Sequence, residues 1–418
     1  MTAQQPWRRQ HGGVAILVAL SLTVLIGFIG LVLDLGRLYV NRSELQNAAD
    51  ACALAAAAEL NCDPDVAGAC TPAYLERAEA IGRFVAGQNR RDFQGQPVSI
   101  HATDVRFHTA LAPNEAYLAR SNNPSPSARY VMCIARANGI TPWFMGVLGQ
   151  GPSDLQAYAV ATLQPAQRFC SSSPIGVCSK PGHGAPHFGF TPGEWIESAF
   201  NSGGNGDVLE GNFRWVDFDP PAGGTEELRE EIAGVSQRCN LSIGDPVEEY
   251  GVKQGAKSAY NVRFGLYQQG ANAFTPETAP PDYTGYAYPD NSGIGIGVSA
   301  LADYLAHQGN NTPFSSSAYG ISGPGGNIPG NAISEEMHHD WGRERRLLTV
   351  PMIDCDATHS TPIVGVGCVL MLNPMANGAN GVIYLEFIGE VGAAGVPCRT
   401  SGAVGGSGSG PLVPTLVQ

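Results

Sequence analysis

The chain has 418 residues with a formal net charge of −13, and this acidity argues against nucleic acid or an anionic membrane surface as the main partner. Glycine and proline make up about a fifth of the chain, which indicates a loop-rich region, but 43% hydrophobic residues exclude wholesale disorder. This length can bury one large core or two modest ones.

The first element is an apolar run of twenty residues without a charge, Val14–Leu33. At about 1.5 Å per residue a helix of this length spans the ~30 Å hydrocarbon core of a bilayer. A cleaved secretory signal is the alternative, but its apolar region is shorter, and Asp34 and Arg37 follow this run directly. We therefore predict a cytoplasmic segment at 1–13 and a transmembrane helix at 14–33, called the stem below.

The stem carries small residues at every fourth position, Ala15, Ala19, Thr23 and Gly27, which we call the ridge. Small residues on one side of a membrane helix let another helix approach closely, so the ridge predicts a packing face for a partner. The alternative is that such residues are simply common in membrane helices.

The spacing of small and apolar residues in 34–60 predicts that the same helix continues as an amphipathic segment. Its small and apolar positions form what we call the seam, namely Leu38, Leu45, Ala49, Cys52 and Ala56. The seam suits close packing against a partner helix or against the chain's own extracytoplasmic region, and the sequence leaves both open.

Ten cysteines, an even number without any CxxC pair, favour disulfides in an oxidising compartment over a zinc or thioredoxin-like site. A reduced and buried set is the alternative. The rest of the chain is thus predicted to be extracytoplasmic, although the positive charges beside the stem favour this orientation only slightly. The candidate local pairs are Cys62 with Cys70, Cys170 with Cys178, and Cys355 with Cys368.

Two segments resemble a known family. Gly13 to Leu60 contains a D-x-G-R-x-Y motif from Asp34 to Tyr39, followed by an alanine-rich L-Q-x-A-A-D segment, and is similar to the amino-terminal signature of TadE/TadG-like pilus-assembly proteins. Thr141 to Ala161, beginning TPWFMGVLG, is similar to a later segment of that family. Two departures are Val18, where pseudopilin-like members have glutamate, and the absence of the D-x-S-x-S metal motif of some larger members.

The resemblance implies a non-enzymatic component of the tight-adherence (Flp) pilus machinery, without cofactor, in the bacterial inner membrane. It also implies a large periplasmic domain and partners that are other pilus-assembly proteins or pilins, contacted through the amino-terminal helix.

The remaining pattern predicts an α+β region in two parts and a tail. The first part, 61–164, has helices at 72–88 and 142–149 and strands at 92–108, 128–137 and 155–163. The second part, 165–401, is rich in loops, with helices at 225–233 (capped by Thr225), 293–305 and 334–346 and strands at 347–353, 363–372 and 382–388. We predict a flexible tail at 402–418, with an edge strand at 411–418.

Motifs for catalysis are absent or incomplete. Gly251, Gly255, Lys257 and Ser258 miss the phosphate-loop spacing, and no G-x-S-x-G elbow occurs. The run 337–340, with His338 and His339, is interpreted as a solvated helix face, and 183–187 as a loop. We therefore predict no catalytic residue, no metal ligand and no cofactor.

Aromatic clusters leave one alternative function open. Rings that stack on sugars would suit a membrane-tethered module that binds peptidoglycan or another envelope glycan, or a hydrolase, although core packing is the preferred explanation. The aromatic residues concerned are Phe213, Trp215, Phe218, Tyr283, Tyr286 and Tyr288.

Overall fold

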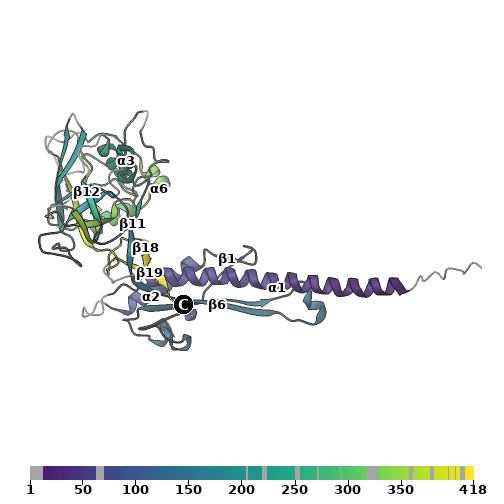
Figure 1. Ribbon diagram of the computed structural model, residues 1–418. Coiled ribbons are helices and arrows are strands. Elements are labelled where there is room, and N and C mark those ends of the chain that lie inside the picture. Colours follow the sequence, from purple (N-terminus) through teal and green to yellow (C-terminus); the bar gives the residue numbers. More distant parts are fainter. Residues whose placement is uncertain are drawn as a thin grey trace, which may run out of the picture. The chain divides into compact units, whose positions relative to one another are not determined.

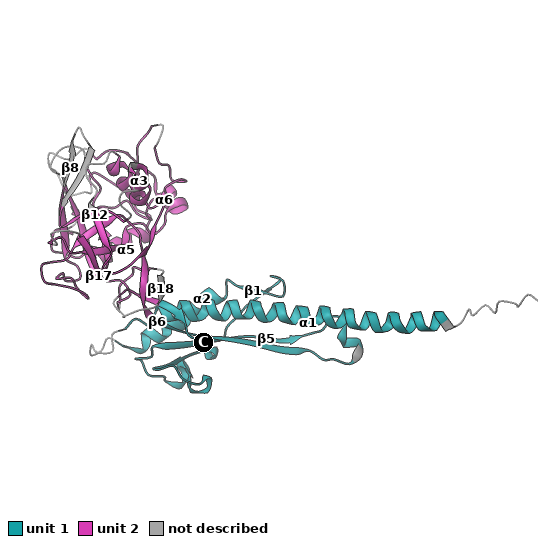
Figure 2. Ribbon diagram, viewed as in Figure 1, with its two compact units in different colours: residues 1–163, 414–418 teal, residues 164–413 magenta. Residues whose placement is uncertain are grey.

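The structure is a computed structural model that divides into two compact units (Figure 2). Unit 1 comprises Met1–Leu163 with Pro414–Gln418, and unit 2 comprises Gln164–Val413. The fold is mixed α+β, as predicted. The residues described are 13–62, 70–203, 206–218, 224–249, 255–270, 273–291, 293–317, 328–356, 361–376, 381–393, 395–400, 402–404 and 410–418.

Unit 1 is built on one uninterrupted helix, α1 (Gly13–Ala58), which contains both the stem and the predicted amphipathic continuation. The helix is long and apolar enough to cross a membrane. Large apolar side chains of the stem are more than half exposed at most positions, whereas from Leu45 onward many α1 side chains are fully buried. The first half of α1 is therefore not packed against other parts of the chain, whereas the second half is packed in a core.

The core of unit 1 lies between the second half of α1, a second helix and a sheet (Figure 1). The strand order among these elements is β6-β5-β3-β4, all antiparallel. The elements are α2 (Pro72–Ala86), β1 (Arg90–Arg91), β2 (Gln96–Pro97), η1 (Ala102–Asp104), β3 (Val105–His108), η2 (Asn114–Ala116), β4 (Leu118–Ala119), η3 (Arg120–Asn122), β5 (Tyr130–Ile140), η4 (Met145–Leu148) and β6 (Ser153–Ser171).

Small residues let α1 and α2 approach closely. A Cβ added to Gly82 of α2 would lie 3.0 Å from the Cβ of Ala56 and 3.0 Å from the carbonyl oxygen of Cys52. Cys52 also forms a disulfide with Cys133 of β5, which ties α1 to the sheet. The alanine-rich segment is therefore the close-packed centre of unit 1.

Unit 2 contains a sheet of order β12-β10-β7-β15-β16-β17-β8-β9, in which β12 also pairs with β16 and so closes a ring of five strands. Such closure removes free edges from those strands. The elements are β7 (Ile175–Cys178), β8 (Trp195–Gly203), β9 (Gly206–Gly211), β10 (Phe213–Asp217), α3 (Thr225–Ala233), β11 (Arg238–Leu241), β12 (Pro246–Glu249), α4 (Ala256–Asn261), η5 (Val262–Phe264), β13 (Leu266–Tyr267), α5 (Leu301–Gly309), β14 (Asn331–Ala332), α6 (Glu335–Trp341), β15 (Leu347–Ile353), β16 (Thr361–Met371), β17 (Gly381–Glu390), β18 (Gly402–Val404) and β19 (Leu412–Leu416), the last of which continues into unit 1.

Two predicted helices are shorter in the structure than expected. The helix expected at 293–305 begins only at Leu301, since the Asp290 carboxylate accepts the N–H groups of Gly293 and Ile294. The helix expected at 334–346 ends at Trp341. Helix α3 starts at Thr225 itself, with Gly224 and not Thr225 at the N-cap.

The tail contains two strands, β18 and β19, that both pair with β6. Strand β19 lies where an edge strand is expected, whereas β18 lies in the part expected to be flexible. In unit 1, the N–H of Val417 donates to the carbonyl of Val160. A chain end with alternating apolar residues can complete a sheet edge, which explains the order. Residues 405–409 lie outside the described part of the chain.

The ten cysteines form five disulfides, of which the predicted local bridge Cys62–Cys70 is one. The other two local predictions are wrong, because strand pairing joins cysteines that are distant in sequence. For example, Cys170 near the end of β6 meets Cys239 of β11, the strand beside it. The remaining bridges are Cys52–Cys133, Cys178–Cys355 and Cys368–Cys398.

Candidate functional site

The ridge of the stem lies open in this structure. Ala15, Ala19 and Thr23 are exposed, and a Cβ added to Gly27 would meet nothing within 4 Å. The Thr23 hydroxyl donates to the carbonyl of Ala19 inside the helix, so its polar group needs no outside partner. The ridge is therefore an uncovered strip of small residues on an apolar helix.

The seam, in contrast, is covered by the chain itself. Leu45, Ala49, Cys52 and Ala56 are fully buried in the core of unit 1, and Leu38 packs partly buried against that core. Of the two interpretations that the sequence allowed, packing on the chain's own extracytoplasmic region is the one that this structure has. These side chains are not free for a partner helix in this arrangement.

The stem ends at a carboxylate that holds a loop of the sheet. Asp34, the first charged residue after the stem, accepts hydrogen bonds from the backbone N–H groups of Trp143, Phe144 and Met145, at 2.7, 3.0 and 2.7 Å. These three residues lie in the loop between β5 and β6. The D-x-G-R-x-Y motif and the TPWFMG segment, about a hundred positions apart, are therefore bonded to each other.

Arg37 adds a second connection one turn further along α1. Its guanidinium forms two hydrogen bonds to the Asp92 carboxylate, at 2.8 and 2.7 Å, and a third to the carbonyl of Thr141 at 2.9 Å. It also lies 4.6 Å from the centre of the Trp143 ring, within cation–π range. We call Asp34, Arg37, Asp92 and Trp143 the exit cluster.

The partnership within the exit cluster is not evident from the sequence. Asp34 and Trp143 belong to two separate motifs, and Asp92 belongs to neither. The sequence does place two charged residues, Asp34 and Arg37, directly after the apolar run. This placement indicates that they have partners, because a charge near the end of a stem needs one. Of the other motif residues, Tyr39 is 76% exposed.

The helix that carries these features matches a known family. Residues 12–59 match the model described as "Putative Flp pilus-assembly TadE/G-like". Helix α1 coincides with this TadE/G-like match. The match covers the stem, the charged motif after it and the alanine-rich segment, and it ends before α2. No curated protein and no solved structure matches the chain.

The ion pair between Arg37, within the matched segment, and Asp92 predicts a pH-dependent contribution to stability. Hydrogen bonding to Arg37 lowers the pKa of Asp92, so the folded state stabilises the ionised carboxylate. This stabilisation is present above the unfolded-state pKa of about 3.9 and is lost as the pH falls through the lowered folded-state pKa.

We expect Asp92→Asn to lower the free energy of unfolding of unit 1 by about 1–2 kcal/mol at pH 7. In strongly acidic solution the variant and the wild type should become equally stable. Thermal unfolding of the detergent-solubilised chain across this pH range measures the effect, and a stability difference that does not change with pH would contradict the assignment.

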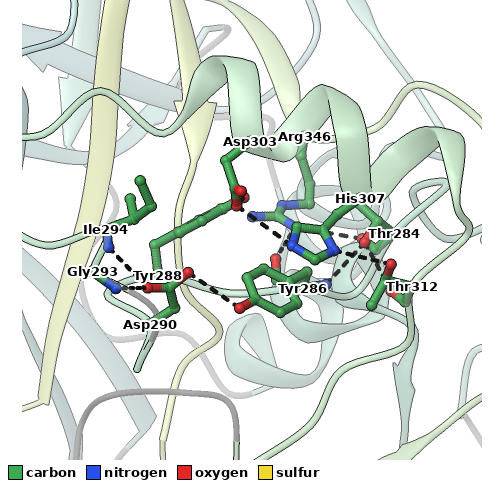
Figure 3. Close-up of polar contacts among 10 residues, drawn as sticks. All are labelled: Thr284, Tyr286, Tyr288, Asp290, Gly293, Ile294, Asp303, His307, Thr312 and Arg346. Atoms are coloured by element: carbon green, nitrogen blue, oxygen red, sulfur yellow. Dashed lines mark hydrogen bonds and ion pairs between the residues drawn. The ribbon is translucent and has the colours of Figure 1, made fainter.

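In unit 2, the aromatic residues considered for sugar stacking are occupied within the fold. Phe213 and Trp215 are fully buried. Figure 3 shows Tyr286 stacked on His307, with ring centres 3.6 Å apart, and the Tyr288 hydroxyl bonded to Asp303 at 2.8 Å. Tyr283 stays partly exposed, and Phe218 packs against a core. The ring faces needed for a glycan platform are therefore mostly used for packing.

The histidine and phosphate-loop candidates do not form a site in the described residues. Met337, His339 and Asp340 are exposed, as the expected solvated face requires, but His338 is fully buried. The Nδ1 of His338 lies 2.7 Å from the carbonyl oxygen of Asp282. Burial lowers the pKa of His338, which favours the neutral ring. Among the described residues no group of His, Cys, Asp and Glu could hold a metal ion. Gly251 lies outside the described residues.

Unit 2 has a cavity of about 380 Å³ beside β7 and β8, and its lining includes Lys180, Glu194 and Trp195. The Lys180 ammonium lies 2.6 Å from the Glu194 carboxylate. The Trp195 indole N–H donates to the carbonyl of Val298. Because these polar groups are already paired with each other or with backbone, the cavity does not indicate a particular substrate.

Proposed function

We propose that this chain is a single-pass inner-membrane component of a Flp-type pilus-assembly machinery that acts through protein–protein contacts and catalyses no reaction. The family match of residues 12–59 supports the pilus-assembly role. Five disulfides support an extracytoplasmic location for the region after the stem. The partners are other pilus-assembly proteins or pilins.

The observation that carries this proposal is the division of α1 at Asp34. Beyond it, the helix is buried in unit 1, so its small residues there serve the chain's own fold. Before it, the ridge is open, and small residues in lipid permit close helix packing. A partner helix therefore contacts the ridge within the membrane.

Two hydroxyl residues of the stem provide a matched test. Thr23 lies on the ridge, whereas Ser21 lies two positions away and about 200° around the helix, on the opposite side. Both are exposed, and both donate to a carbonyl one turn back, that of Ala19 and Val18 respectively. Leucine at either position preserves the membrane span.

We expect Thr23→Leu to reduce pilus assembly about ten-fold, because closely packed polar and small contacts between membrane helices contribute about 1–2 kcal/mol. Ser21→Leu should assemble pili like the wild type. Pili are counted by electron microscopy at equal protein levels. Equal assembly by both variants would argue against a partner at the ridge.

A further inference from the structure

The loop of residues 141–149 lies alongside the last turn of the stem as well as beside its end. A Cβ added to Gly30 would lie 2.7 Å from the Cβ of Phe144, so Phe144 packs directly on Gly30. Gly30 is inside the uncharged run, one helical turn or about 6 Å before Asp34. The loop therefore reaches back past the first charged residue, alongside the apolar part of α1.

The side chains that this loop presents are those expected at a lipid boundary. Val147 is 91% exposed, Trp143 55% and Phe144 47%. The sequence has no charged residue between Arg136 and Asp154. Tryptophan prefers the membrane–water interface, where its ring meets acyl chains and its polar edge meets headgroups.

Several backbone N–H groups of the loop are also hydrogen-bonded within the protein, as a region with little water requires. Irregular backbone is tolerated at membrane depth only where its polar groups are hydrogen-bonded within the protein. Asp34 accepts three of the N–H groups, those of residues 143 to 145. The N–H groups of Val147, Gly149 and Gln150 donate to loop carbonyls.

We propose that residues 143–147 insert into the interfacial layer of the extracytoplasmic leaflet and form a second membrane contact beside the stem. The Arg37–Asp92 pair, one turn beyond Asp34, lies at headgroup level. Two contacts at one leaflet would fix the tilt and rotation of unit 1 on the bilayer, and hence the direction in which the ridge faces. This inference rests on the proposed function, because it requires the stem to span a membrane.

The test uses three full-length variants, each with a photoreactive p-benzoylphenylalanine, reconstituted in vesicles of phosphatidylethanolamine and phosphatidylglycerol. Val147→p-benzoylphenylalanine probes the loop, and the same change at Leu25 probes the stem. Leu111 is the control, because it is 53% exposed and follows β3, whose His108 pairs with Tyr130. Tyr130 is at the end of β5 remote from the loop, about 33 Å away along the strand.

After illumination, mass spectrometry should find lipid adducts at Leu25 and Val147, with yields about ten-fold above that of Leu111, since side chains in the headgroup and acyl boundary contact lipid continuously. An adduct at Leu25 without one at Val147, or a Val147 adduct to a second protein copy, overturns this inference alone. No lipid adduct at either position overturns the proposed membrane function with it.

Discussion

Ala49→Glu is expected to unfold unit 1. Ala49 is fully buried where α1 packs in the core of unit 1. A glutamate there would bury a carboxylate without a prepared partner, which costs about 3–5 kcal/mol or more, and its extra atoms do not fit a site packed around alanine. Because domains are stable by only about 5–15 kcal/mol, we expect a large loss of folded protein.

The matched control is Asn47→Glu, because Asn47 is exposed on the same helix and two positions away. Protease resistance and thermal unfolding of the detergent-solubilised chain compare the two variants. If Ala49→Glu left unit 1 folded but abolished pilus assembly, the seam would be a partner interface in the working state. That result would overturn the interpretation that the seam serves the chain's own core.

Arg346→Met is expected to destabilise unit 2 strongly. The guanidinium of Arg346 is fully buried and donates to the carbonyl of Met371, at 2.9 and 2.6 Å. It also donates to the carbonyl of Tyr286, at 2.6 Å (Figure 3). It lies 4.1 Å from the centre of the Phe264 ring. Methionine would fill part of the space but would leave these carbonyls without donors. We expect a loss of about 3–5 kcal/mol.

The same substitution predicts a pH dependence through Asp282, which is also fully buried. Burial raises the pKa of Asp282, and the positive charge of Arg346 opposes this rise. Without Arg346, the pKa of Asp282 rises further. A raised folded-state pKa means that stability falls as the pH rises above the unfolded-state value of about 3.9, so the variant should lose more stability at pH 8 than at pH 4.

Thermal unfolding at both pH values tests this prediction. The control is Arg343→Met, since Arg343 is exposed and its side chain bonds only to the neighbouring Gly342 carbonyl among the contacts described for it. Suppose that both arginine variants lose the same amount of stability, or that the loss in Arg346→Met does not change with pH. Either result would show that Arg346 does not neutralise buried charge in unit 2.

Local sequence patterns determined the elements whose signal repeats along the chain. The uncharged run of the stem and the spacing of alanines after it predicted α1, because helix formation depends on neighbours three and four positions apart. The strand β15 was predicted with its observed bounds, and β16 and β17 nearly so, since each is a short apolar run between turn residues.

Contacts between distant residues were decided only by the tertiary structure. The partner of Cys170 depends on which strand lies beside β6, and the role of Asp34 depends on a loop more than a hundred positions away. The burial of His338 depends on the backbone of Asp282, which no local pattern encodes. For the same reason the seam could be recognised as a close-packing surface from sequence, but only the folded sheet and α2 show that the chain itself covers it.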